Sequence, residues 1–139
     1  MSIKSITFGK AFIIVFLLAF MAFAAGETDW NETLQSALQG IDRIRIRTGG
    51  TCCRNPAHEK TLVEIRDSQA IMKIISQIQI ARSGNGFHCM CCGDPSLEFY
   101  KGDSLVVALS FHHDRSLRWD SGKWPGDGLL TEESAEFLC

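Results

Sequence analysis

Five of the six cysteines in this chain fall into two short segments, and this clustering constrains the fold more than any other feature. One segment holds Cys52 and Cys53, and the other, His88 to Gly93, holds three more. A disulfide or a shared metal ion between the segments would fix two loops that lie far apart in the sequence. Which of the two forms depends on the compartment, because thiols are usually oxidised outside the cytosol.

The N-terminus predicts export. Two lysines precede residues 11–25, which carry no polar side chain, and small residues around position 24 offer sites for a signal peptidase. A helix that crosses a bilayer needs roughly 20 apolar residues, so the shorter run favours a signal peptide over a retained anchor, which is the alternative. We therefore expect residues 1–26 to be removed on export to the periplasm or beyond. Residues 27–139 would form one domain that meets the membrane only through its leader.

The charge of the exported part excludes one class of partner. Removing residues 1–26 takes away two lysines and no acidic residue, which leaves 12 basic residues against 16 acidic ones. A nucleic-acid-binding domain shows a basic surplus instead, so we expect no nucleic acid as a partner.

Apolar periodicity predicts an α+β domain. Alternating residues predict strands over 41–47, 61–66, 97–100, 105–113 and 116–120. Isoleucines at 71, 74, 75 and 78 fall on one face of a helix that begins near Asp67 or Ser68. Shorter helices are predicted over 30–39 and after Thr131. The order of elements predicts an antiparallel sheet of about five strands, with one long helix packed on a face and a short C-terminal helix.

Several segments of the C-terminal half resemble a set of bacterial exported proteins that have no established activity. The shared segments are Cys89-Met90-Cys91-Cys92-Gly93, Ser116-Leu117-Arg118-Trp119 and Trp124-Pro125-Gly126-Asp127. The resemblance implies a bacterial, exported protein and assigns no chemistry.

Disulfides are the first interpretation of the cysteines. The candidate bridges join Cys52 or Cys53 to Cys89, Cys91 or Cys92. Such a bridge closes a loop of about 37 residues and contributes about 3–4 kcal/mol in the chain-entropy model. Five clustered cysteines cannot all pair among themselves, so one is left for Cys139, for a second chain or for a metal.

A metal site is the second interpretation. Cys89 and Cys92 have the C-x-x-C spacing, followed by glycine, that directs two thiolates at one zinc ion. Cys52 and His88 are the candidates for the remaining ligands, with Cys53 and His58 as alternatives, and the soft sulfur ligands also suit copper(I). The same C-x-x-C pair would serve a redox reaction. However, no helix is expected after it to lower a thiol pKa.

The polar strand end at His112, His113 and Asp114 is a weaker candidate. Adjacent strand residues face opposite ways, so we do not expect the two imidazoles to converge. If catalysis takes place here, we expect it at His113 with Asp114 and Arg118.

Three arginines, Arg43, Arg45 and Arg47, share one face of the first predicted strand, about 7 Å apart. We expect them to pair with acidic residues such as Glu64 and Glu98 rather than to bind an anion.

No set of residues meets the requirements for a nucleophile, a base and a stabilising group together. The sequence therefore predicts an exported, non-enzymatic binding or interaction module stabilised by disulfides, without a cofactor. An exported zinc- or copper-binding protein is the second hypothesis, and a thiol redox protein is the third.

Overall fold

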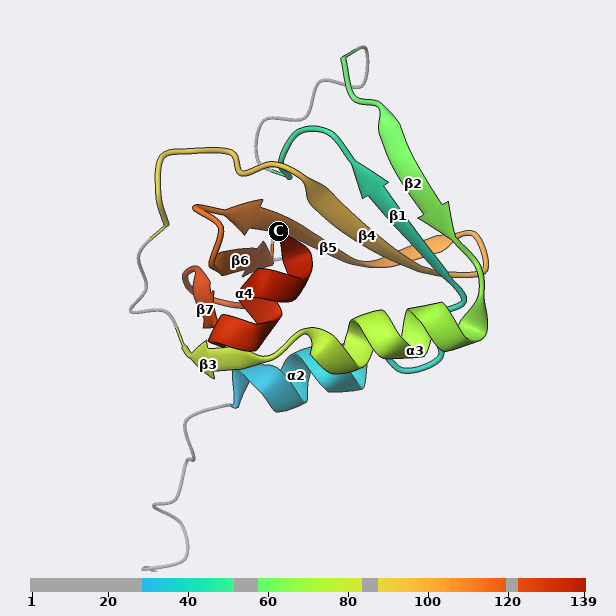
Figure 1. Cartoon of the computed structure of the whole chain (residues 1–139), viewed down its shortest axis with the longest axis horizontal. Coiled ribbons are helices and arrows are strands. Elements are labelled where there is room, and N and C mark those ends of the chain that lie inside the picture. The colour runs from blue at the N-terminus through green and yellow to red at the C-terminus, as the bar shows by residue number, and fades with distance from the viewer. Residues whose placement is uncertain (1–28, 52–57, 84–87, 120–122) are drawn as a thin grey trace, which may run out of the picture.

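The structure is a computed structural model of the chain and describes residues 29–51, 58–83, 88–119 and 123–139. These residues form a seven-stranded antiparallel sheet in the order β2-β1-β4-β5-β6-β7-β3, accompanied by three helices (Figure 1). The strands are β1 (Arg43–Arg47), β2 (Thr61–Ile65), β3 (Ile80–Arg82), β4 (Ser96–Lys101), β5 (Ser104–His112), β6 (Ser116–Trp119) and β7 (Gly128–Leu130). The helices are α2 (Trp30–Ala37), α3 (Ser68–Gln77) and α4 (Glu132–Leu138). The predicted leader, residues 1–26, lies outside the described residues.

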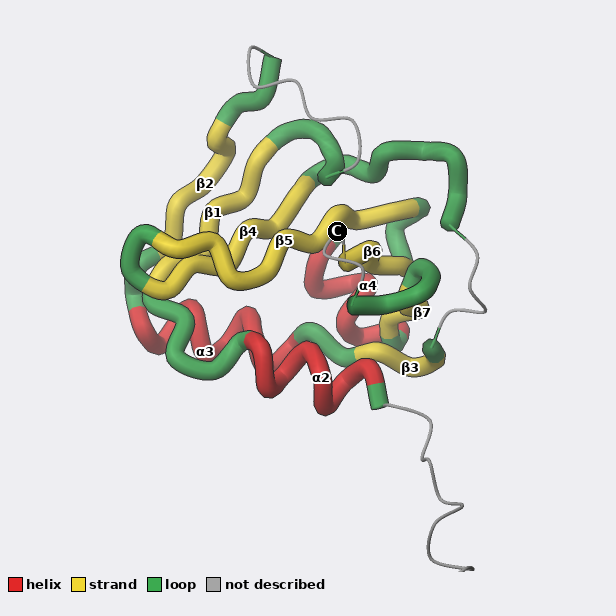
Figure 2. Tube along the Cα trace, turned by 180° about the vertical axis from the view of Figure 1, so that it is seen from behind, coloured by secondary structure: helices red, strands yellow, loops and turns green. Residues whose placement is uncertain are grey.

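Each helix begins where a side chain accepts a hydrogen bond from the first turn. Asp29 caps α2 and Asp67 caps α3 through their carboxylates, and Thr131 caps α4 through its hydroxyl. α2 and α3 lie side by side below the sheet, as Figures 1 and 2 show from opposite sides. Gln35 of α2 joins them by donating to backbone carbonyls at the C-terminal end of α3. No helix within the described part of the chain is long and apolar enough to span a membrane.

The two faces of the sheet differ in chemistry. On β4 and β5, alternate residues such as Phe99 and Leu109 are buried in the apolar core with the helices. The residues between them, including Glu98, Ser110 and His112, point to the opposite face and are buried as well. Loops that cover this second face therefore enclose a layer of polar side chains.

The prediction of an α+β fold with an antiparallel sheet is confirmed, but its detail is wrong. In the described residues the sheet has seven strands rather than about five, and the three helices, each near a predicted position, are of comparable length rather than one long and two short. The missed strands, β3 and β7, have three residues each and pair with each other at one edge of the sheet. Three residues are too few to show an alternating pattern.

The arginine row pairs mainly with one carboxylate. Arg45 and Arg47 both donate to Glu98, at 2.7–2.9 Å, as expected, while Glu64 lies on the exposed edge strand β2. Burial raises the pKa of Glu98. The hydroxyl of Tyr100 and the two guanidinium groups outweigh that effect and hold the pKa below its usual value.

Candidate thiol and imidazole site

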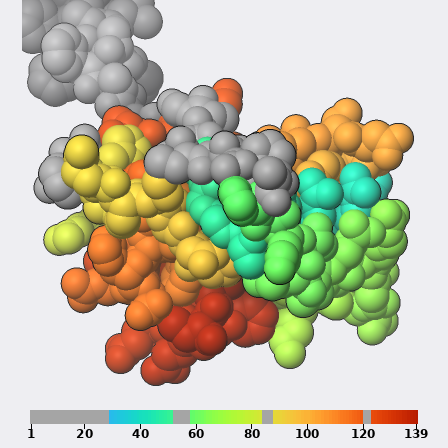
Figure 3. Space-filling view, turned by 90° about the horizontal axis from the view of Figure 1, so that it is seen from above, coloured from blue at the N-terminus to red at the C-terminus, as the bar shows by residue number. Residues whose placement is uncertain are grey.

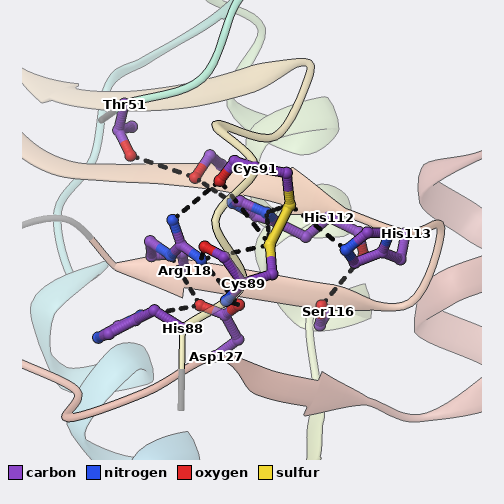
Figure 4. A network of polar contacts seen from close by, with 10 residues as sticks. Thr51, His88, Cys89, Cys91, His112, His113, Ser116, Arg118 and Asp127 are labelled. Atoms are coloured by element: carbon purple, nitrogen blue, oxygen red, sulfur yellow. Dashed lines mark hydrogen bonds and ion pairs between the residues drawn. A yellow bond between two sulfur atoms is a disulfide. The ribbon is translucent and has the colours of Figure 1, made fainter. Parts of the chain in front are cut away.

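A disulfide joins Cys89 to Cys91, with a Cα–Cα distance of 5.3 Å, in the loop that leads into β4 (Figure 4). Both cysteines are partly exposed, and Met90 between them is 100% exposed. Figure 3 shows this cysteine-bearing segment, in yellow, at the surface. Cys92 is also disulfide-bonded, and Cys139 carries a free thiol.

His112, the last residue of β5, lies directly against this disulfide. Its Nδ1 atom is 3.2 Å from the Sγ atoms of both Cys89 and Cys91 (Figure 4). Its other nitrogen, Nε2, is 2.8 Å from the Ser110 hydroxyl, which lies 3.1 Å from the hydroxyl of Thr51. This chain of hydrogen bonds fixes the orientation of the imidazole.

Burial lowers the pKa of His112, and the positive charge of Arg118 lowers it further, against the opposing charge of Asp127. The ring is only 1% exposed. The lowered pKa favours the neutral imidazole, in which one nitrogen carries a proton and the other offers a lone pair.

His113 reaches the same site, which corrects the expectation that the two imidazoles diverge. Its Nε2 atom is 3.3 Å from Cys91 Sγ, and the two rings are 6.4 Å apart between centroids. The alternation rule fails because β5 ends at His112 and the backbone of His113 and Asp114 takes the left-handed conformation, with φ of 51° and 56°. The chain therefore turns at His113, and both imidazoles contact Cys91.

Arg118 and Asp127 hold the backbone of the cysteine loop. Buried Arg118 donates to both carboxylate oxygens of Asp127 at 2.7 and 2.9 Å, and to the carbonyls of Cys89 and Cys91 at 2.9 and 3.1 Å. Asp127 in turn accepts the backbone N–H of Cys89. Arg118 thus pairs with Asp127 and holds the cysteine loop, whereas the prediction grouped it with His113 and Asp114 as the place for catalysis.

The pKa of Asp127 reflects this arrangement. Burial raises it, but hydrogen bonds from Arg118, His88 and the Cys89 backbone lower it more, to about 2. The carboxylate is therefore ionised at any physiological pH and keeps its hold on the loop.

Glycine is required where the loops pack together. A Cβ atom on Gly93, which has φ of 70°, would lie 2.5 Å from His112 Nε2. A Cβ atom on Gly50 would lie 1.4 Å from the carbonyl oxygen of Cys92. Both glycines let backbone approach the polar layer more closely than any side chain permits.

The structure assembles a different ligand set from the one expected. It brings Cys89 together with Cys91 and His112, whose donor atoms all lie within 4.8 Å of one another. His88 bonds to Asp127 at 3.0 Å instead, and Cys92 is engaged in its own disulfide. Cys52 and Cys53 lie outside the described residues, so a bridge between the two cysteine segments stays a prediction.

One signal for the position of His112 is present in the sequence. Ser110 and His112 are two residues apart on a strand, so they share a face, and a hydroxyl beside an imidazole is a positioning contact. Thr51 and Asp127 come from distant segments, which local patterns do not connect.

Comparison with family models, with curated proteins and with solved structures finds no match to this chain. The chemistry of the site is therefore argued from its own geometry: a partly exposed disulfide, two imidazoles against its sulfurs, and a buried ion pair that holds the loop.

Proposed function

We propose that the protein is an exported thiol–disulfide redox protein whose reactive pair is Cys89 and Cys91. The observation that carries this proposal is the imidazole nitrogen of His112, 3.2 Å from both sulfurs. In thiol–disulfide exchange, attack on one sulfur expels the other as a thiolate. A neutral imidazole that carries its proton on Nδ1 can donate it to whichever sulfur departs as a thiolate, while Nε2 accepts from the Ser110 hydroxyl.

The reaction with a substrate dithiol balances without a cofactor. A substrate thiolate attacks one sulfur of the pair, the Cys89–Cys91 bond breaks, and a mixed disulfide forms. The second substrate thiol then attacks the mixed disulfide, which releases an oxidised substrate. The two protons of the substrate thiols end on Cys89 and Cys91, and His112 lies where it can pass them to either sulfur.

Exposure of the site supports this chemistry. The sulfurs are partly exposed, while the imidazole of His112 lies behind them in the polar layer. A substrate thiol therefore approaches from solvent, and its leaving group departs toward a fixed nitrogen. The fully exposed side chain of Met90 offers the substrate an apolar contact beside the pair.

The experiment mixes the oxidised, purified protein with a reduced dithiol peptide and follows formation of the peptide disulfide. We expect one peptide oxidised per protein, with Cys89 and Cys91 appearing as thiols after alkylation and mass spectrometry. His112→Ala should slow the reaction by about 100-fold or more. The control is His58→Ala, which changes an exposed histidine ahead of β2.

Peptide oxidation at an unchanged rate by the double variant Cys89→Ser/Cys91→Ser would disprove the proposal. An unchanged rate in His112→Ala would remove the role assigned to the imidazole.

A further inference from the structure

The reduced form of the same site carries a second activity. We propose that Cys89 and Cys91, once reduced, bind one zinc ion together with His112 and His113. The inference rests on the proposed function in one respect only, that the pair can be reduced in the folded protein. It adds a cation that the redox reaction does not use.

Distances in the oxidised site already approach those of a tetrahedral metal centre. Zn–S bonds of about 2.3 Å and Zn–N bonds of about 2.0 Å, at the tetrahedral angle, place sulfur and nitrogen ligands about 3.6 Å apart. Three of the four sulfur–nitrogen distances are 3.2, 3.2 and 3.3 Å. His112 therefore already has its donor atom in place, whereas His113 lies outside the set of donor atoms within 4.8 Å of one another and must move closer to complete the site.

The two sulfurs must move as well. They are bonded to each other in the disulfide, whereas a tetrahedral zinc centre requires about 3.8 Å between them. Reduction removes the bond, and rotation about the Cα–Cβ bonds of Cys89 and Cys91 supplies the remaining separation. The disulfide and the metal exclude each other, because both use the same two atoms.

Charge favours zinc over copper(I). Two thiolates and two neutral imidazoles carry a charge of −2, which Zn²⁺ cancels and Cu⁺ leaves half neutralised. The nearest buried cation, Arg118, is already paired with Asp127. A neutral centre suits this partly buried position better than a charged one, and two sulfur with two nitrogen ligands is a common zinc set.

The surroundings supply the outer contacts that metal centres need. Ser110 holds Nε2 of His112 at 2.8 Å, which leaves Nδ1 directed at the sulfurs and available to a metal. Arg118 fixes the carbonyls of both cysteines, so the loop keeps its position when the disulfide opens.

The test reduces the purified chain with a phosphine, removes the phosphine under anaerobic conditions and titrates the protein with Zn²⁺, with Co²⁺ as a spectroscopic probe and with Cu⁺ in a separate arm. We expect one Zn²⁺ per chain and a thiolate-to-cobalt charge-transfer band. Ser110→Ala should weaken zinc binding by about 10–100-fold, the range for a residue that positions a ligand. His112→Ala should weaken it further, and Ser104→Ala, which changes an exposed serine of the same strand as Ser110, should leave it unchanged.

The outcomes separate this inference from the redox proposal. A reduced protein in which alkylation locates thiols at both Cys89 and Cys91 but which binds no zinc, or binds Cu⁺ alone, overturns the zinc site and leaves the redox function standing. Zinc binding without peptide oxidation overturns the redox function alone. If the phosphine frees no thiol at Cys89 or Cys91 in the folded protein, both proposals fail. If the oxidised form binds zinc as strongly as the reduced form, the zinc site proposed here fails.

Discussion

The Cys89–Cys91 bridge should contribute little to the stability of the fold, and its removal tests this directly. The disulfide closes a loop that contains only Cys89, Met90 and Cys91, because the sequence separation is 2. In the chain-entropy model a loop of three residues contributes about 1.6 kcal/mol at 25 °C. A bridge that closed a loop of about 37 residues would contribute roughly 3.8 kcal/mol.

We therefore expect the double variant Cys89→Ser/Cys91→Ser to lose no more than about 1.6 kcal/mol of unfolding free energy. Urea denaturation followed by circular dichroism measures this loss. With a denaturant slope of about 1–3 kcal/mol/M, the midpoint should fall by no more than about 0.5 M for the steepest slope and about 1.6 M for the shallowest. Cys139→Ser, which removes only the exposed free thiol, is the control and should not shift the midpoint. A loss of more than about 3 kcal/mol would show that the bridge is a structural staple, and the argument for a redox role would fail.

Three further predictions concern the residues around the site. Ser110→Ala leaves two buried polar groups without their shared partner and should lower the unfolding free energy by about 1–3 kcal/mol, whereas Ser104→Ala, exposed on the same strand, should change it by less than about 0.5 kcal/mol in thermal or urea unfolding. Gly93→Ala should slow peptide oxidation, because its Cβ would meet the imidazole at 2.5 Å, while Gly102→Ala has a similar positive φ and open space around it, so an equal effect of both would contradict the contact. The folded-state pKa of Glu98 is lowered, so its carboxylate stabilises the fold above the unfolded pKa, and this stabilisation is lost as pH falls through the folded value. Urea midpoints measured from neutral to acid pH should therefore fall less steeply in Glu98→Gln than in the unchanged protein. An equal slope in both would contradict this.

The main elements of the fold follow from the sequence, and the short ones do not. Apolar alternation and helical spacing suffice for α3, β1, β4, β5 and β6, because each buries apolar residues in a common core. The edge strand β2 also follows the predicted alternation, although only its Ile65 packs against that core. β3 and β7 form because they pair with each other at the edge of an existing sheet, with Ile80 opposite Leu130. This pairing is a tertiary contact, which the pattern of three residues does not predict.

The sequence predicts only part of the site. The cysteine segment is a predicted site, but its C-x-x-C spacing groups Cys89 with Cys92, whereas the structure pairs Cys89 with Cys91. That choice depends on the loop path set by Arg118 and Asp127, which are distant from the cysteines in sequence. The convergence of His113 with His112 on Cys91 is not predictable, because nothing in the residue type of His113 predicts left-handed backbone after a strand.

The expectation of an exported binding module stays a prediction, and the redox proposal is the more specific hypothesis. It differs in requiring that one disulfide opens while the fold persists. A purely structural bridge stays closed in the native state, whereas a redox pair must open in it.

The most direct test of this central claim equilibrates the native protein in glutathione buffers of increasing reducing strength, traps thiols by alkylation and locates them by mass spectrometry. We predict that Cys89 and Cys91 become alkylated together while the near-ultraviolet circular dichroism of the folded protein is retained. Alkylation of these two cysteines only in step with the loss of that signal would contradict the account.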